Sequence, residues 1–159
     1  MIRCTFHLNG GALSILSCPG VGFFPAYSGN AGPHRNNPAS ISIKTVGPIP
    51  PGNYYIVDRP RGGRLGWLHD SVHTTASGSD RDLWFALYRE DACIDDHTWV
   101  GDIERGEFRL HPAGRSGVSE GCITLPNHNQ FKLLRDALLV TARRLVGVNL
   151  FAYGEVRVY

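Results

Sequence analysis

The sequence predicts a mainly β fold, a sandwich or an open barrel, with one long helix on one side. Three observations support this prediction: short apolar or alternating segments recur along the chain, turns rich in Gly and Pro separate them, and helical spacing of apolar residues occurs once, late in the chain. The 159 residues, 42% of them hydrophobic, suit one domain with a sizeable core. We therefore expect a single domain over residues 1–159.

The N-terminal segment has the pattern of a hairpin. Residues 3–8 alternate, residues 9–11 have turn chemistry, and residues 12–16 continue as a strand. Residues 18–38, rich in Pro, Gly and Asn, are too long for a simple connector. We expect this last segment to be a functional loop or to be ordered against the site.

The middle of the chain predicts further strands. Residues 41–46 and 53–58 are expected strands, joined by a turn over residues 47–52 whose prolines preset the backbone angles. Residues 61–82 are expected to form a loop or a short helix. The aromatic and apolar residues 83–88 are expected to form a buried strand.

Two short strands are expected on either side of a loop rich in Gly and Ser. Residues 107–111 alternate between polar and apolar side chains, and residues 121–125 form the second segment of strand character. Adjacent strands here would bring His111 and Cys122 together. The acidic region 91–102 is expected to be a turn region, and none of its carboxylates is assigned to orient His111.

The one long helix follows these strands. Its apolar stripe has helical spacing, is expected to pack on the sheet, and has Gly147 as its expected stop. The stripe consists of Phe131, Leu134, Leu138, Ala142 and Leu145. Residues 148–153 and 155–159 are expected to close the chain as an edge hairpin around Gly154.

His111 and Cys122 are the candidate base and nucleophile. A thiol attacks a carbonyl well only as the thiolate, and a nearby imidazole lowers the thiol pKa and passes a proton to the leaving amine. Because Gly121 permits close approach of the backbone, the N–H groups of Gly121 and Cys122 are expected to form an oxyanion hole, with Ser119 as a further donor. The pattern favours acyl transfer through a cysteine.

The four cysteines leave their pairing open. Cys4, Cys18, Cys93 and Cys122 lack the Cys-x-x-Cys spacing of a zinc site. Cys4 and Cys18 flank the hairpin and would pair in an oxidising compartment, and reduced buried thiols are an equal alternative. A structural disulfide at Cys122 would remove the nucleophile.

Composition argues against several kinds of partner. The 16 Lys and Arg against 14 Asp and Glu give a formal charge of +2, and the charges are scattered, so no nucleic-acid partner is expected. No stretch approaches the roughly 18 apolar residues of a membrane helix, and the first residues lack the apolar core of a secretory signal. His69 and His73 stand four apart without a third ligand, so neither a metal nor another cofactor is expected.

Residues 119–123, following the upstream His111, resemble the signature of L,D-transpeptidases of the YkuD type, in which a histidine and a variable loop precede Ser-His-Gly-Cys. The chain departs at Glu120, where those enzymes usually carry a second histidine, and its loop is short. Both departures resemble the L,D-transpeptidase effectors of type VI secretion systems. Residues 24–29 and 47–56 resemble segments of the same effectors, so the resemblance covers most of the chain.

The resemblance implies an L,D-transpeptidase-like β-sandwich or open barrel that acts on peptidoglycan stem tetrapeptides. Cys122 would attack the diaminopimelate carbonyl and release D-Ala, while His111 would act first as base and then as acid. Water, a D-amino acid or a second diaminopimelate amine would then accept the acyl group, and the first two are the expected toxic activities. Tyr27, Ser28 and Gly29 are expected to contact the substrate.

The resemblance also implies a route of delivery. The protein would be made in the cytoplasm without a cleaved signal and be secreted to act in the periplasm of a target bacterium. A cognate immunity protein and a carrier in the secretion machinery are implied partners. The alternative is a non-catalytic module that binds peptidoglycan or glycan, with Tyr27, Trp67 and Trp99 lining a groove, or an adaptor domain of a secretion machine.

Overall fold

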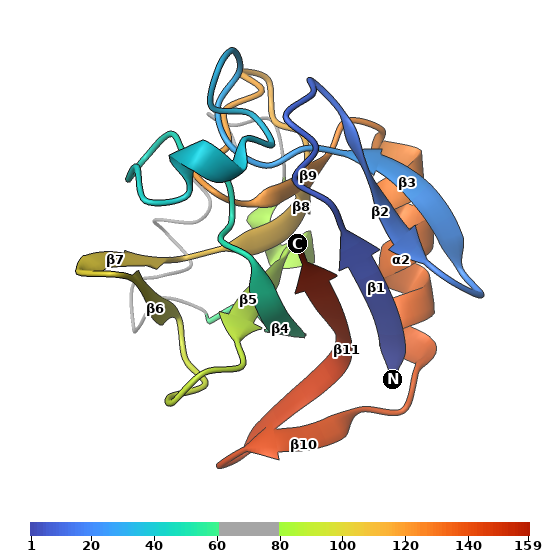
Figure 1. Cartoon of the computed structure of the whole chain (residues 1–159). Coiled ribbons are helices and arrows are strands. Elements are labelled where there is room, and N and C mark those ends of the chain that lie inside the picture. Colours follow the sequence, from blue (N-terminus) through green and yellow to red (C-terminus); the bar gives the residue numbers. More distant parts are fainter. Residues whose placement is uncertain (61–79) are drawn as a thin grey trace.

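The computed structural model describes residues 1–60 and 80–159 and is mainly β, with one α-helix, α2 (His128–Val140), among those residues (Figure 1). Most of the strands form one sheet. In spatial order they are β3 (Gly22–Ala26), β2 (Ser14–Cys18), β1 (Ile2–Phe6), β11 (Leu150–Val158), β4 (Gly52–Asp58), β5 (Phe85–Arg89), β8 (Arg109–Pro112) and β9 (Ile123–Leu125).

Smaller elements complete the fold. A ninth strand of the described sheet, β10 (Arg144–Gly147), pairs with β11 alone. A separate hairpin, β6 (His97–Val100) with β7 (Ile103–Gly106), extends away from the sheet (Figure 1). Two short 3-10 helices, η1 (Pro38–Ser40) and η2 (Arg81–Leu83), lie in the loops.

The sheet curves until its two end strands nearly meet. Just beyond β3, the Tyr27 N–H donates to the Thr124 carbonyl of β9 at 2.9 Å, and the Thr124 N–H donates to the Tyr27 carbonyl at 2.8 Å. This single bridge joins the first and last strands of the path. The predicted mainly β fold with an open barrel is therefore confirmed.

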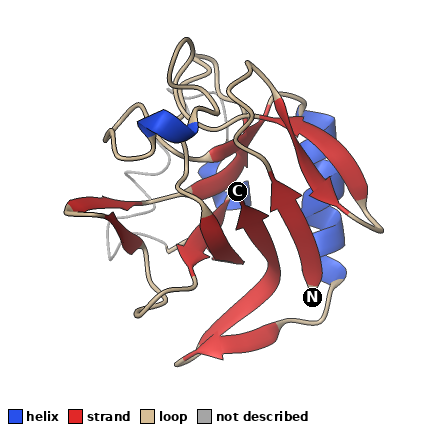
Figure 2. Ribbon diagram, viewed as in Figure 1, coloured by secondary structure: helices blue, strands red, loops and turns tan. Residues whose placement is uncertain are grey.

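The helix α2 lies alongside the curved sheet (Figure 2), and buried side chains from both form the core. Phe131, Leu134 and Leu138 on α2 are buried, as their helical spacing predicts. Asn127 caps the helix by accepting hydrogen bonds from the backbone of Asn129 and Gln130. Within the described residues, no helix is long and apolar enough to span a membrane.

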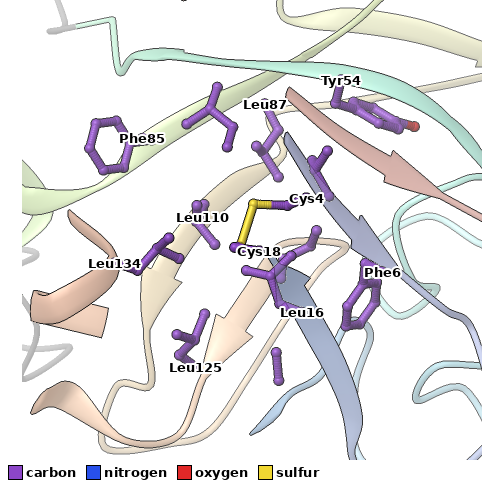
Figure 3. Packing of buried hydrophobic residues seen from close by; sticks show 14 of the residues in the cluster. Cys4, Phe6, Leu16, Cys18, Tyr54, Phe85, Leu87, Leu110, Leu125 and Leu134 are labelled. Atoms are coloured by element: carbon purple, nitrogen blue, oxygen red, sulfur yellow. A yellow bond between two sulfur atoms is a disulfide. The ribbon is translucent and has the colours of Figure 1, made fainter. Parts of the chain in front are cut away.

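A disulfide joins Cys4 on β1 to Cys18 on β2 in the middle of this core (Figure 3). The β1–β2 register pairs Thr5 with Ser17, so the two cysteines stand directly opposite each other on neighbouring strands. Cys93 and Cys122 are free. Of the two alternatives open from the sequence, the structure has the paired one, and the nucleophile candidate is left as a thiol.

Two expectations from the middle of the chain are wrong, and a third is confirmed in one of its two forms. Residues 41–46 form turns, not a strand, because the backbone bonds locally, as from the Gly47 N–H to the Ile43 carbonyl. Segment 18–38 contains β3, which pairs with β2 along its whole length, and its residues 27–29 are ordered against residues 119–124, as the second alternative for this segment predicted. The acidic region 91–102 contains β6, whose partner β7 follows directly.

Two expectations near the C-terminus are also wrong. The helix ends at Val140, because Thr141 is extended and its hydroxyl donates to the Ala137 carbonyl, so Leu145 lies on β10 and is exposed. Gly154 is no turn but lies inside β11, a central strand. A Cβ there would approach the Ile2 carbonyl oxygen to 2.7 Å, so glycine permits the close approach of β1.

Candidate active site

Strand register gathers the candidate catalytic side chains on one face of the sheet. β8 and β9 lie side by side and parallel, with Leu110 opposite Ile123 and His111 opposite Thr124 (Figure 1). Because side chains alternate along a strand, Leu110 and Ile123 enter the core while His111 and Thr124 face the other way. The predicted adjacency of the two segments is confirmed. We call this outward side of β8 and β9 the site face.

Cys122 shares the site face. It immediately precedes β9 and stands two residues before Thr124, so it projects to the same side, beside Arg109 of β8. His111 lies two residues beyond Arg109 on β8, so it is the diagonal neighbour of Cys122 on this face. Among the described residues, no hydrogen bond joins the Cys122 sulfur to the His111 ring.

The His111 ring is held on three sides. Its Nδ1 lies 2.7 Å from the Pro112 carbonyl oxygen and its Nε2 lies 3.3 Å from the Thr124 hydroxyl. The Trp84 ring stacks on it with a centroid separation of 4.2 Å. Because a carbonyl only accepts, Nδ1 carries the proton and Nε2 keeps its lone pair, accepting from the Thr124 hydroxyl.

The surroundings of His111 keep it neutral. Its pKa is lowered to about 4, mainly by burial and also by the charges of Arg81 and Arg109, while the bond to the Pro112 carbonyl acts in the opposite direction. At neutral pH the ring is therefore an uncharged imidazole whose unprotonated Nε2 accepts from the Thr124 hydroxyl. That is the protonation state that a general base requires.

The Cys122 thiol differs from the expectation of an activated thiolate. Burial raises its pKa to about 11, and Glu120 and Asp96 act in the same direction. The backbone N–H and guanidinium of Arg109 oppose that rise. The expected lowering of the thiol pKa by the imidazole is wrong for this resting state, because His111 is itself uncharged. The pair is a neutral thiol and a neutral imidazole, which suits proton removal during attack rather than a preformed ion pair.

Arg109 and Asp96 form an ion pair next to the thiol. Both guanidinium NH groups of Arg109 lie 2.6 Å from the Asp96 carboxylate oxygens, and both side chains are largely buried. The carboxylate of the acidic region thus binds Arg109, while the backbone of Pro112 orients His111. Sequence reasoning missed Arg109, Trp84 and Thr124, although the period of two around His111 already places Arg109 on its face.

Position 121 requires a glycine, because of its backbone conformation and because of the groups that lie close to it. Its φ is +114°, and a Cβ would lie 2.7 Å from the Phe108 ring and 2.9 Å from the Arg105 guanidinium. This conformation lets the chain enter β9 with Cys122 on the site face. The oxyanion hole expected at the N–H groups of Gly121 and Cys122 stays a prediction.

The predicted site residues of the N-terminal half lie against the cysteine loop. Tyr27 bridges to Thr124, Ser28 donates from its hydroxyl to the Gly121 carbonyl at 3.1 Å, and the Gly29 N–H donates to the Ser119 hydroxyl at 3.2 Å. Ser119 in turn donates to the Cys122 carbonyl at 2.9 Å. All four residues are buried, so the structure makes them neighbours of Cys122, and contact with substrate stays a prediction.

Other candidates fall outside this cluster. His128 begins α2, is exposed, and its Nε2 contacts the Ala113 carbonyl at 2.7 Å. Trp67, His69 and His73 lie outside the described residues. Among residues 1–60 and 80–159, no group of three His, Cys, Asp or Glu side chains is arranged to hold a metal ion.

Comparisons with known proteins bear on the family. No curated protein matches the chain. The family profile described as the Tlde1 domain matches residues 22–149, a span that includes His111, Cys122 and every strand from β3 to β10. The match covers most of the chain, which therefore belongs to the Tlde1 domain family, a family of enzymatic antibacterial effectors of type VI secretion systems.

Proposed function

We propose that this effector is a cysteine acyl-transfer enzyme that acts on peptidoglycan stem tetrapeptides, as an L,D-carboxypeptidase and as an L,D-transpeptidase that exchanges the terminal D-amino acid. The observation that carries the proposal is the shared site face. It presents a free thiol at Cys122 and a neutral imidazole at His111, whose unprotonated Nε2 accepts a hydrogen bond from Thr124 and becomes the proton acceptor when that bond is released. The resemblance of the cysteine loop to L,D-transpeptidases supplies the substrate class.

The proposed reaction uses these two groups in sequence. The Cys122 sulfur attacks the carbonyl of the diaminopimelate residue while its proton passes to Nε2 of His111. The tetrahedral intermediate then collapses, the carbon–nitrogen bond to D-Ala breaks, and His111 returns the proton to the departing amine. Water or a free D-amino acid attacks the thioester and restores the thiol.

The environment of His111 favours the second half of this cycle. Its low pKa makes the imidazolium a strong acid toward the leaving amine, but the same low pKa makes the neutral ring a weak base toward a thiol of raised pKa, so in this proposal proton transfer is coupled to formation of the carbon–sulfur bond. The Arg109 guanidinium lies beside the sulfur and favours negative charge there. Action in the periplasm of a target cell, a carrier in the secretion machinery and a cognate immunity protein are parts of the same proposal.

Mass spectrometry of muropeptides incubated with the protein tests this function. The wild type is expected to remove D-Ala from tetrapeptides, and to replace it when a different D-amino acid is present. Cys122→Ser is expected to leave the tetrapeptides intact, while Cys93→Ser, the control at the other free cysteine, trims them normally. Trimming by Cys122→Ser at the wild-type rate would show that another residue is the nucleophile.

A further inference from the structure

Two buried serines hold the carbonyl groups on either side of the nucleophile. The Ser28 hydroxyl lies 3.1 Å from the carbonyl oxygen of Gly121, which precedes Cys122. The Ser119 hydroxyl lies 2.9 Å from the carbonyl oxygen of Cys122 itself. Ser28 is 0% and Ser119 is 2% exposed, so solvent does not compete for these bonds.

The direction of each bond follows from a second contact. The backbone N–H of Ile49 donates to the Ser28 hydroxyl at 2.8 Å, and that of Gly29 donates to the Ser119 hydroxyl at 3.2 Å. A serine hydroxyl has one proton and an amide N–H can only donate. Each serine therefore accepts from the N-terminal half of the chain and gives its proton to a carbonyl beside Cys122.

Holding a carbonyl also aims the N–H on the other side of the same peptide bond. In a trans peptide the C=O and N–H groups point in opposite directions. Because Ser28 fixes the Gly121 carbonyl, the Cys122 N–H points away from residues 27–30. The Ser119 bond fixes the next peptide plane in the same way, so both planes attached to the nucleophile are set by tertiary contacts.

The loop before Cys122 is tied to the same N-terminal segment. The Ser119 N–H donates to the Asn30 side chain at 3.1 Å. The Tyr27 hydroxyl and the Arg35 guanidinium both donate to the Gly117 carbonyl, at 3.3 and 3.2 Å. Residues 27–35 thus hold the loop from Gly117 to Cys122 in place, and we call these residues the brace. The hydrogen bonds of Ser28 and Ser119 are its contacts nearest to Cys122.

We propose that Ser28 and Ser119 are positioning residues that fix the peptide planes around Cys122 and aim its backbone N–H at the oxyanion of the tetrahedral intermediate. The inference rests on the proposed acyl transfer. It assigns the serines no contact with substrate, because their only protons are committed to the two carbonyls. The Cys122 N–H is then the group that touches the reacting oxygen.

Two probes of the same thiol test this assignment in a Cys93→Ser background. With p-nitrophenyl acetate the sulfur attacks the ester carbonyl, an oxyanion forms, the bond to nitrophenolate breaks, and the thiol proton passes to His111. With iodoacetamide the sulfur displaces iodide at a saturated carbon and no oxyanion forms. Ser28→Ala and Ser119→Ala are expected to slow acylation by about 10- to 100-fold and to change alkylation by no more than about twofold.

Two further variants are matched to these. Ser14→Ala removes a buried hydroxyl that donates to the His7 carbonyl and to no carbonyl of the cysteine loop, and it is expected to leave both rates near the wild type. Ser119→Thr keeps a hydroxyl that can accept from the Gly29 N–H and donate to the Cys122 carbonyl, so it is expected to acylate faster than Ser119→Ala.

The competing outcomes are distinct. A parallel fall of both rates in the alanine variants would mean that the serines only stabilise the loop, and unchanged acylation would mean that they do not aim the N–H. A wild type that is alkylated but not acylated at Cys122 would exclude an oxyanion donor there. Neither probe requires peptidoglycan, so failure of the tetrapeptide activity alone would overturn the proposed function and leave this assignment standing.

Discussion

The two faces of β8 and β9 are built from alternate residues of the same strands, and they do different work. One face packs Leu110 and Ile123 into the core, where both are almost completely buried. The other carries His111, Cys122 and Thr124 beside the ion pair of Arg109. The core face stabilises the fold and the site face carries the candidate catalytic groups. A shift of register by one residue would place the apolar side chains on the site face and the polar ones in the core, so both stability and activity would be lost.

The difference lies in how polar groups on the site face are satisfied. His111 is as well buried as many core residues, but every polar atom of its ring has a partner. The core face has no such requirement and is stabilised by apolar contact alone. Substitutions on the two faces are therefore expected to separate activity from stability.

The largest expected effect comes from removing the base on the site face. His111→Gln keeps a polar side chain but has no group that takes up a proton at neutral pH, so kcat/KM for tetrapeptide trimming is expected to fall by about 10²- to 10⁴-fold. In the wild type, kcat/KM is expected to rise as the pH rises through about 4, where His111 loses its proton. Steady-state kinetics over a range of pH measure the loss of kcat/KM in His111→Gln and the rise of kcat/KM in the wild type. If the rise near pH 4 persists in His111→Gln, it belongs to the titration of another group.

On the core face, Leu110→Ala is expected to lower the free energy of unfolding by about 2–5 kcal/mol, because it leaves a cavity beside Ile123. Denaturant titration measures this loss. The folded fraction is expected to keep trimming activity, with Cys122 alkylated at close to the wild-type rate. Loss of thiol reactivity without loss of stability would contradict the division between the two faces.

The disulfide stabilises the core on the strands that lead to the brace. Cys4 and Cys18 are separated by 14 residues, and closing a loop of that size stabilises a fold by about 3 kcal/mol. We expect the double variant Cys4→Ala, Cys18→Ala to lose about 3 kcal/mol of the free energy of unfolding, and therefore to unfold at a lower denaturant concentration. Treatment of the wild type with a reductant is expected to reproduce the shift, and to leave the double variant unaffected.

The burial of His111 predicts a pH dependence of stability. Its pKa is lowered from 6.5 to about 4 in the folded state, so protonation favours the unfolded chain. Above pH 6.5 the full contribution of His111 to the free energy of unfolding is present. This contribution, about 3 kcal/mol, is lost as the pH falls from 6.5 toward 4. Comparing denaturation of the wild type and His111→Gln at pH 7 and at pH 4 isolates it. An equal loss in both proteins would assign the effect to other groups.

The smallest expected effect concerns the charge beside the thiol. Asp96 raises the pKa of Cys122 and also neutralises Arg109, which lowers it. Asp96→Asn is therefore expected to lower the pKa of the thiol and to increase its alkylation rate at pH 8 by several-fold. The isosteric amide keeps one hydrogen bond to Arg109 but leaves that largely buried charge without its counter-charge, so some loss of stability is also expected. Slower alkylation would mean that Asp96 acts mainly by holding Arg109 in place.

Local pattern was sufficient for part of the fold and for the centre of the site. The period of two in residues 107–111 and 121–125 predicted two strands that bring His111 and Cys122 to one region, and both segments are strands in register. The spacing of Phe131, Leu134 and Leu138 predicted the buried side of α2. In residues 41–46 the strand prediction was wrong, because turn hydrogen bonds, and the Arg105 side chain that donates to the Ile41 carbonyl, satisfy that backbone instead of a partner strand.

The sequence by itself determined a mainly β chain, one amphipathic helix, and a histidine on one strand with a cysteine at the start of its neighbour, because strand and helix periods are local properties of the residues. Only the tertiary structure decided the protonation of the pair, the partner of Asp96 and the role of residues 27–35. Burial and the direction of a hydrogen bond depend on which distant segments meet. Ser28 is adjacent to Gly121 because the curved sheet brings the end of β3 to β9, a contact that no local pattern contains.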